Sequence, residues 1–251
     1  LPAAINELYT NAARNNAGGH NSIFRGKNLG TSYTSAMSKA IQSGTFDDLF
    51  VGDYLTINGT VYRVAGFNLG KQIGDNTSMG NSMCLVPDSA LYNAQMHNTD
   101  SGQYTEGAAA NTTTGAYANS DMRTANLAQA TQKIVSDFGS SHVMSYRDIL
   151  PNATADGQAS GWAWYDCKVE LMSETMVYGT KVWANSGYEV GCINSQFPLF
   201  ALAPEYIHRR FTYWLRGVGS ATYFCSVGYA GAANPSGASH SGGVRPFFFV
   251  N

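Results

Sequence analysis

The chain has 251 residues, enough to bury a sizeable core in one large domain or in one domain with an appendage. Only 13% of the residues are charged, 44% are hydrophobic, and the formal net charge is −2 at pH 7. This composition gives no support to nucleic-acid binding, which needs a basic stripe, and no apolar run approaches the ~20 residues of a membrane span.

The cysteines and histidines show no metal or redox pattern. Cys84, Cys167, Cys192 and Cys225 are far apart and include no C-x-x-C pair, so buried free thiols are the expectation, although the count would permit two disulfides. His20, His97 and His142 share no spacing. We therefore expect no metal and no cofactor.

The first 45 residues differ in composition from the rest of the chain. Residues 3–14 have helical composition, and a second short helix is predicted over residues 35–42, with Thr34 as N-cap and Gly44 past its end. The opening residues lack the basic and then apolar pattern of a signal peptide. We predict an N-terminal helical connector over residues 1–45, or the first helix of the main domain, and a main domain over residues 46–251.

The clearest strand signal comes directly after this segment. Tyr54–Ile57 and Val61–Val64 flank Asn58-Gly59, which is the strongest short-range signature of a β-hairpin. Residues 83–86 read as a buried strand that Pro87 stops, with a helical turn over residues 88–92.

The middle of the chain mixes helices, short strands and loops. The best helix is predicted over residues 120–138, capped by Asn119 or Ser120 and ended by Gly139. The remaining predictions are a long surface loop over 97–118, an extended segment at 142–147, a loop over 151–161, a second helix over 169–178, a strand at 181–183 and a short helix at 204–207. The fold class is therefore α+β, with a mainly antiparallel sheet, two principal helices and long loops.

The last forty residues are the most informative. Phe211–Arg216 and Gly243–Val250 read as buried strands. Between them, residues 217–242 contain no Asp, Glu, Lys or Arg and are rich in Gly, Ala, Ser, Asn and Tyr. A flexible linker is one interpretation. The Tyr, Ser, Gly and Asn mixture is typical of binding loops, however, and it favours a displayed binding surface.

Segments along nearly the whole chain resemble, in order, one domain family of phage minor tail proteins and bacterial surface proteins. The segments are Phe24-Arg-Gly-Lys-Asn-Leu29, Phe50-Val-Gly-Asp-Tyr54, Val86-Pro-Asp-Ser-Ala-Leu-Tyr92, Trp164-Tyr-Asp166, Glu170-Leu-Met172 with Met176-Val-Tyr-Gly179, Pro198-Leu-Phe200, Tyr213-Trp-Leu-Arg216 and Gly243-Val-Arg-Pro246. That family is found near the C-termini of minor tail proteins of phages that infect Gram-positive gut bacteria.

The last third also resembles the C-type-lectin-fold variable proteins of diversity-generating retroelements. The resemblance implies a C-type lectin fold, a location in the phage tail of the virion or on the bacterial surface, and binding to a host cell-surface protein or glycan. Because tail receptor-binding proteins are commonly trimers, it also implies a homotrimer as the assembly to test. Neither nucleic acid nor membrane insertion is expected.

Carried onto this chain residue by residue, the exposed ligand-binding positions fall within residues 217–242. They are Gly217, Gly219, Thr222, Tyr223, Cys225, Ser226, Gly228, Tyr229, Ala230, Ala232, Asn234, Pro235, Ser236, His240 and Gly242. Tyr223, Tyr229 and His240 are the expected anchors, because aromatic groups dominate binding energy at low entropic cost. Trp214, Leu215, Val244 and Phe247–Phe249 are expected to be the buried residues that cannot vary.

Two further chemistries compete with simple binding. Calcium-dependent sugar binding needs carboxylate ligands, and residues 211–251 contain none, while Asp48 is better explained by a turn. An oxidase-like enzyme of the formylglycine-generating fold needs paired reactive cysteines, whereas Cys225 stands alone, with His208 or His240 as the available bases. We therefore predict a binding protein rather than an enzyme. The remaining alternative is a structural tail component without its own ligand. Arg245 is expected to hold the terminal strand.

Overall fold

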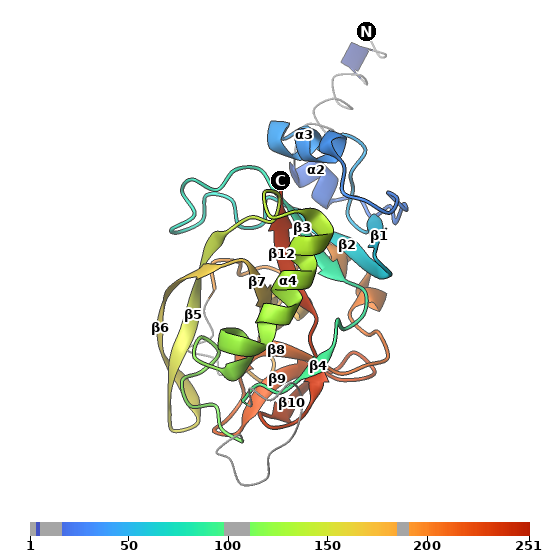
Figure 1. The fold of residues 1–251 in the computed structure, drawn as a ribbon. Helices are drawn as coiled ribbons and strands as arrows, with labels where there is room; N and C mark the ends of the chain where they lie inside the picture. The colour runs from blue at the N-terminus through green and yellow to red at the C-terminus, as the bar shows by residue number, and fades with distance from the viewer. Residues whose placement is uncertain (1–3, 6–16, 98–110, 185–190) are drawn as a thin grey trace.

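The computed structural model describes residues 4–5, 17–97, 111–184 and 191–251, and Figure 1 shows its ribbon. The helices described are α2 (Ala17–Asn21), α3 (Ser35–Ser43), the π-helix η1 (Met122–Asn126), α4 (Leu127–Phe138), α5 (Glu174–Tyr178), α6 (Pro198–Leu202) and the 3-10 helix η2 (Pro204–Tyr206). The strands are β1 (Tyr54–Ile57), β2 (Thr60–Phe67), β3 (Met83–Pro87), β4 (Asn93–Ala94), β5 (Tyr146–Ala155), β6 (Gln158–Cys167), β7 (Val169–Leu171), β8 (Tyr213–Val218), β9 (Tyr223–Val227), β10 (Ala233–Gly237), β11 (Gly242–Gly243) and β12 (Pro246–Val250). The predicted α+β class is confirmed, and these strands pair antiparallel except where β11 lies beside β8.

The first sheet has the strand order β1-β2-β3-β12-β7. Strands β1 and β2 form the predicted hairpin, and both turn residues have positive φ, 47° at Asn58 and 77° at Gly59. A type I′ turn needs positive φ at both positions, and asparagine followed by glycine adopts it at low steric cost. The dipeptide therefore fixes the register of this hairpin.

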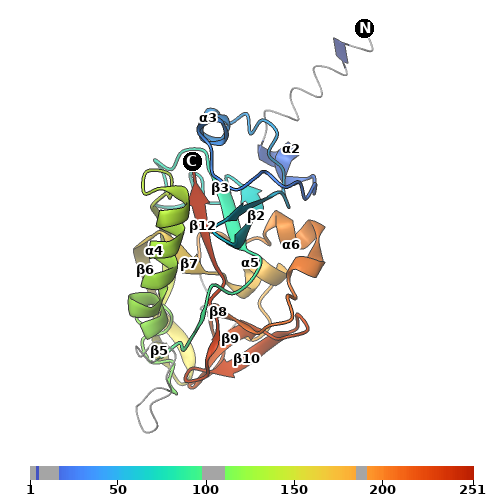
Figure 2. The ribbon, with the colours of Figure 1, turned by 45° about the vertical axis from the view of Figure 1, so that its right-hand side comes forward.

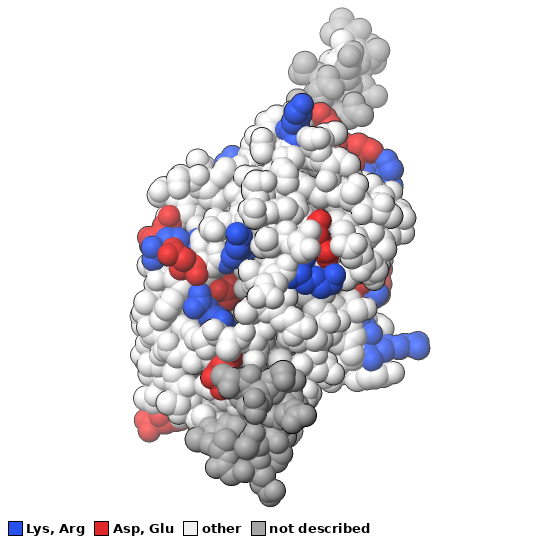
Figure 3. All heavy atoms as spheres, in the orientation of Figure 1, with Lys and Arg blue, Asp and Glu red and all other residues white. Residues whose placement is uncertain are grey.

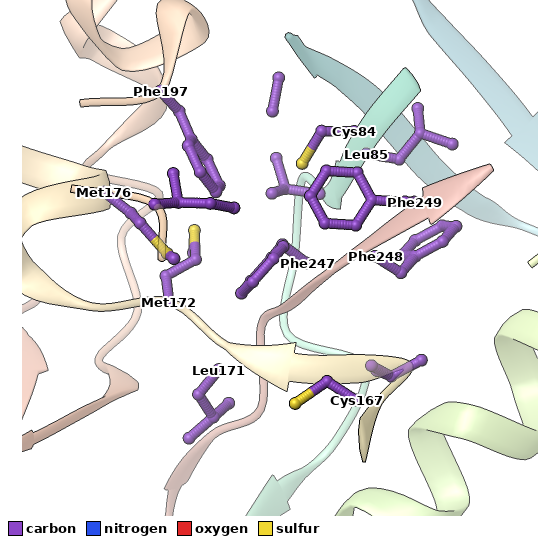
Figure 4. Close-up of a cluster of buried hydrophobic side chains, with 14 of the residues drawn as sticks. Cys84, Leu85, Cys167, Leu171, Met172, Met176, Phe197, Phe247, Phe248 and Phe249 are labelled. Atoms are coloured by element: carbon purple, nitrogen blue, oxygen red, sulfur yellow. The ribbon is translucent and has the colours of Figure 1, made fainter. Parts of the chain in front are cut away.

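Strand β12 lies between β3 and β7 in the first sheet and contributes three aromatic side chains to the core. All three residues of Phe247–Phe249 are fully buried, as predicted. Because side chains alternate along a strand, Phe248 faces one way, with its ring centroid 5.7 Å from that of Tyr62 and 5.1 Å from that of Phe138 in α4. Phe247 and Phe249 face the other way (Figure 4). Figure 2 shows the same division, with α4 on one side of β12 and α5 and α6 on the other.

The helix predicted over residues 120–138 is present as η1 continued by α4. Ser120 provides a cap, because its Oγ accepts a hydrogen bond from the backbone N–H of Arg123 at 3.3 Å. Gly139 follows the last helical residue and ends it, as predicted.

Asp137, in the last turn of α4, joins this helix to the β1–β2 hairpin. Its carboxylate accepts hydrogen bonds from Tyr62 at 2.6 Å and from Asn58 at 2.8 Å, and Lys133 pairs with it at 2.9 Å. Burial raises the pKa of Asp137, but these three donors together outweigh that effect and leave its pKa below the ordinary value. The ionised carboxylate therefore stabilises the folded state.

The second sheet has the strand order β10-β9-β8-β11-β4, and β5 and β6 form a separate long hairpin. Trp214 and Leu215 of β8, with Val244 just after β11, are buried, so this part of the predicted fixed framework is confirmed. In Figures 1 and 2 this sheet lies at the opposite end of the molecule from α3.

Two predictions around residues 151–178 are wrong. Residues 151–161 are not a loop but lie in the β5–β6 hairpin, whose turn residues Asp156 and Gly157 have φ of 51° and 73°. The helix expected over 169–178 shrinks to α5, and β7 precedes it. Strand β7 pairs with β12 through three residues, so tertiary pairing overrides the helical pattern there.

Two shorter predictions are also wrong. Residues 88–92 form bends rather than a helical turn, because Leu91 donates its backbone N–H to Val244 O at 2.9 Å. Residues 181–183 form no strand. Instead, the buried carboxylate of Glu174 accepts hydrogen bonds from the backbone N–H groups of residues 182–184, which curls the chain around it.

The predicted loop over residues 97–118 is described only in part, because 98–110 lie outside the described residues. Tyr117 is fully buried and donates a hydrogen bond to Glu170 at 2.5 Å, so the end of this segment is not surface loop. Most of the helix predicted over residues 3–14 also lies outside the described residues.

Residues 17–45 pack directly on the first sheet. The helix α3 has the predicted caps, with Thr34 Oγ1 accepting from Met37 N and Gly44 in the left-handed region. His20 is fully buried, and its Nδ1 lies 2.6 Å from Leu49 O. Residues 17–45 of the predicted connector thus share the core with the main domain.

Candidate functional site

The predicted binding segment, residues 217–242, runs from the end of β8 through β9 and β10 to the first residue of β11. The turn between β9 and β10 closes where Gly228 N donates to Ala232 O at 2.8 Å. The strand register places Asn234 opposite Ser226, and Ser226 opposite Trp214. Because side chains alternate along each strand, these three residues lie on one face of the sheet.

A cleft of about 540 Å³ opens on this face. It is lined by Gln95, Thr212, Trp214, Asn234, Ser236, Ser239, His240, Ser241 and Gly242. Trp214 forms its floor: the residue is 1% exposed, and its Nε1 donates to Ala94 O at 2.8 Å. A Cβ added at Gly242 would lie only 2.8 Å from that Nε1. The glycine backbone therefore lies directly against an immobilised indole, which makes this part of the cleft rigid.

Hydrogen bonds between the polar groups around the cleft hold these groups in place. Ser226 Oγ lies 2.9 Å from both Asn234 O and Ser236 Oγ, which ties β9 to β10. Gln95 comes from the segment after β4 and donates its amide to Ser239 O. Its Oε1 is buried and has no hydrogen-bond partner within the part of the chain that the structure describes.

The described residues that line the cleft carry no Asp, Glu, Lys or Arg. Their polar groups are hydroxyls, side-chain amides, an imidazole and backbone. On the face shown in Figure 3, basic side chains stand singly or beside acidic ones rather than gathering into one stripe. The site can therefore both donate and accept hydrogen bonds through uncharged groups.

The fifteen predicted positions divide by exposure. The exposed ones are Tyr223, Tyr229, Ala230, Ala232, Asn234 and His240, and the half-buried ones are Gly219, Thr222, Gly228, Pro235 and Ser236. Four are buried, contrary to the prediction: Gly217, Cys225, Ser226 and Gly242. Cys225 and Ser226 lie in β9, which β8 and β10 flank on both sides, and Gly242 lies against Trp214. Gly217, Cys225 and Ser226 cannot contact a ligand without a rearrangement of the sheet, whereas Gly242 lines the cleft through its backbone.

The structure brings four predicted residues together in the cleft, namely Asn234, Ser236, His240 and Gly242. Tyr223 and Tyr229 are exposed but do not line it. Sequence reasoning missed Gln95, Thr212, Trp214, Ser239 and Ser241 as lining residues. Ser239 and Ser241 fall inside the predicted segment, so composition already pointed to them. Gln95 is 144 residues from its partner Ser239, and no local pattern signals such a contact.

The buried arginines of the C-terminal region are engaged inside the fold. Arg216 Nη1 lies 2.6 Å from Asp148 Oδ2, and both side chains are buried. Arg245 is fully buried and donates to Pro87 O at 2.8 Å, so the expectation that it holds the terminal strand is confirmed. Burial lowers the pKa of Arg245. These cations stabilise the sheets and are not offered to a ligand.

The four cysteines are buried thiols, as expected. Burial raises the pKa of Cys84 and of Cys167, and it raises the pKa of Cys192 to about 12. A thiolate nucleophile needs the opposite shift. Cys225 is 0% exposed, so a substrate cannot reach it in this conformation.

No group of three or more His, Cys, Asp or Glu residues able to hold a metal ion occurs within the described residues. Asp48, which the sequence places in a turn, forms ion pairs with Arg25 and Lys27. Hydrogen bonds from Lys27 and then Arg25 lower the pKa of Asp48.

A larger hollow of about 730 Å³ lies at the other end of the molecule, between α3 and residues 27–29. It is lined in part by Lys27 and Asp48, which neutralise each other at 2.5 Å. None of the fifteen predicted positions lines it. The smaller cleft is the better candidate for a binding site. Residues of the predicted segment line it together with Gln95, whose buried Oε1 has no partner among the described residues.

Comparison of the chain with protein-family models, with curated proteins and with solved structures returned no match. Among the described helices, none combines the length and the apolar character that crossing a bilayer requires.

Proposed function

We propose that this chain is a ligand-binding domain of a phage tail or a bacterial surface adhesin, built on a C-type-lectin-like fold. It attaches non-covalently to a host cell-surface protein or glycan. The face formed by β8, β9 and β10 contacts the ligand, with His240 and Asn234 at the cleft and Tyr229 on the neighbouring turn. It acts without a cofactor and catalyses no reaction.

The observation that carries this proposal is the contrast between the two parts of the C-terminal region. The framework of β8 and β12 is buried, whereas residues 217–242 leave Tyr229 63% exposed at the β9–β10 turn and Tyr223 44% exposed in β9. The same segment lines a cleft whose described residues carry no charged side chain. Exposed aromatic rings are costly to leave in water and are the usual anchors of binding surfaces. The buried Cys225 favours this function over an oxidase.

A binding isotherm with purified cell walls of Gram-positive gut bacteria tests the proposal. We expect saturable binding that the double variant Tyr229→Ala with His240→Ala abolishes, because it removes two of the three exposed rings of the segment. Gln129→Ala is the matched control, since Gln129 is also exposed but lies on α4. Uptake that rises linearly without saturation, or a double variant that binds like the parent, would instead favour a structural tail component.

The proposal includes diversification of the exposed positions. Sequencing this gene from many individuals of one population would locate the substitutions. We expect them to crowd into codons for exposed residues such as Ala232 and Asn234, and to spare buried Ser226. Substitutions spread evenly over the chain would contradict diversification and leave a fixed adhesin.

A further inference from the structure

The chemistry of the cleft narrows the ligand class. An ionised ligand group taken out of water needs a partner of opposite charge. The described lining residues offer none, so the ligand part that enters is neutral. Calcium prefers six to eight oxygen ligands, usually including carboxylates, and these residues contain no carboxylate. The cleft therefore binds by direct hydrogen bonds.

The groups that line the cleft match a ligand that both donates and accepts hydrogen bonds. The hydroxyls of Thr212, Ser239 and Ser241 can each do both, as can the amide of Asn234 and the neutral ring of His240. A sugar hydroxyl has the same dual character. The volume of about 540 Å³ also lies within the usual range of ligand pockets, roughly 300–1,000 Å³.

Gln95 is the second, independent observation. The residue is 1% exposed, and its Oε1 lacks a partner among the described residues. Its orientation is fixed, because exchanging the amide oxygen and nitrogen would set two acceptors, Oε1 and Ser239 O, against each other. A buried carbonyl oxygen without a donor destabilises the folded state, and a hydrogen bond from a ligand hydroxyl or N–H would remove that penalty.

A peptide fits the cleft less well than a sugar. Peptides are held by pockets for apolar side chains or by strand addition at a sheet edge. The apolar floor residue, Trp214, is 1% exposed and offers no such pocket. Asn234 and Ser236 lie on the edge strand β10, but their side chains project into the cleft from the face of the sheet, whereas strand addition would use the unpaired backbone edge of β10.

We propose that the cleft binds a neutral saccharide residue without a metal ion, and that Gln95 Oε1 accepts a hydrogen bond from one hydroxyl or N–H of that residue. This inference rests on the proposed binding function. It makes Gln95 a specificity-determining residue outside the displayed segment, so diversification of residues 217–242 changes the rim of the cleft while this acceptor stays in place.

The test probes the full chain on an array of neutral and charged oligosaccharides in buffer containing EDTA. We expect binding to at least one neutral saccharide. The double variant Asn234→Ala with His240→Ala should lose roughly tenfold or more in affinity, as the loss of two hydrogen-bonding groups implies. Gln129→Ala should bind as the parent does. Binding only to charged saccharides, or only after calcium is added, would overturn the inference.

A deoxy series of the bound saccharide tests Gln95 itself. In the parent, removing one particular hydroxyl should weaken binding roughly tenfold, because it leaves Oε1 unpaired. In Gln95→Met, which keeps the side-chain length, removing the same hydroxyl should have little effect, because the oxygen that accepted its hydrogen bond is already absent. A purely structural role for Gln95 predicts equal sensitivity in both chains, which would refute the assignment. Should Gln95→Met fail to fold, the Asn234 and His240 variants still decide whether the cleft binds sugar.

Treated cell walls separate this inference from the proposed function. Binding that periodate oxidation removes and protease leaves intact supports a saccharide ligand, even one absent from the array. Binding that survives periodate but not protease overturns the saccharide inference while the attachment function stands. If neither cell walls nor any saccharide is bound, both fail.

Discussion

Replacing Gly242 with alanine should destabilise the fold, although Gly242 is among the positions predicted to be displayed. The added Cβ would lie 2.8 Å from Nε1, 2.9 Å from Cε2 and 3.2 Å from Cδ1 of Trp214. The indole cannot retreat easily, since it is 1% exposed and bonded to Ala94 O. Overpacking of this kind costs about 1–3 kcal/mol. We therefore expect a loss of that size in the free energy of unfolding.

Urea unfolding measures this loss as a lower midpoint at an unchanged slope. Gly228→Ala is the matched control, because its Cβ would meet Ala232 O at 3.4 Å, an ordinary contact. We expect the control to stay within ~0.5 kcal/mol of the parent. Equal stability of both variants, or an equal loss in both, would refute the claim that contact with Trp214 decides which positions of this segment can change.

Two further predictions concern the framework. Phe248→Ala should lose about 3–5 kcal/mol of unfolding free energy, because it empties the space between Tyr62 and α4. The control Phe24→Ala, which truncates a ring that is already 37% exposed, should lose clearly less. Thermal melts of both variants measure the difference. The lowered pKa of Asp137 means that its carboxylate stabilises the fold at neutral pH and that this contribution is lost as the pH falls from about 4 through the folded-state pKa. The stability advantage of the parent over Asp137→Asn should therefore be present at pH 7 and shrink below pH 4 in urea titrations, and an advantage that stays constant with pH would contradict this assignment.

Local chemistry in the sequence was sufficient for several elements. Asn58-Gly59 determined a hairpin because few other dipeptides accept two positive φ angles at low cost. The helix over 120–138 followed from its apolar stripe, and Gly139 ended it. The aromatic run Phe247–Phe249 specified a buried strand. In each case the signal is a pattern of neighbouring residues, so it can be read from the sequence even where the contacts that bury those residues are distant in the chain.

Other features depended on partners that are distant in the chain. Residues 169–171 joined the sheet because β12 was available to pair with them, which the helical pattern of that segment cannot reveal. The displayed segment had the composition of a binding surface. Only the strand order decided that Ser226 is covered by β10 and that Asn234 is exposed.

The sequence by itself therefore determined the α+β class, the hairpin, the main helix and the uncharged character of the C-terminal segment, because local backbone preference and periodicity fix these. The tertiary structure decided which residues of that segment face solvent, and it brought Gln95 to Ser239 across 144 residues. Exposure and long-range contact depend on how strands stack and pair. A single sequence carries no local signal for that arrangement.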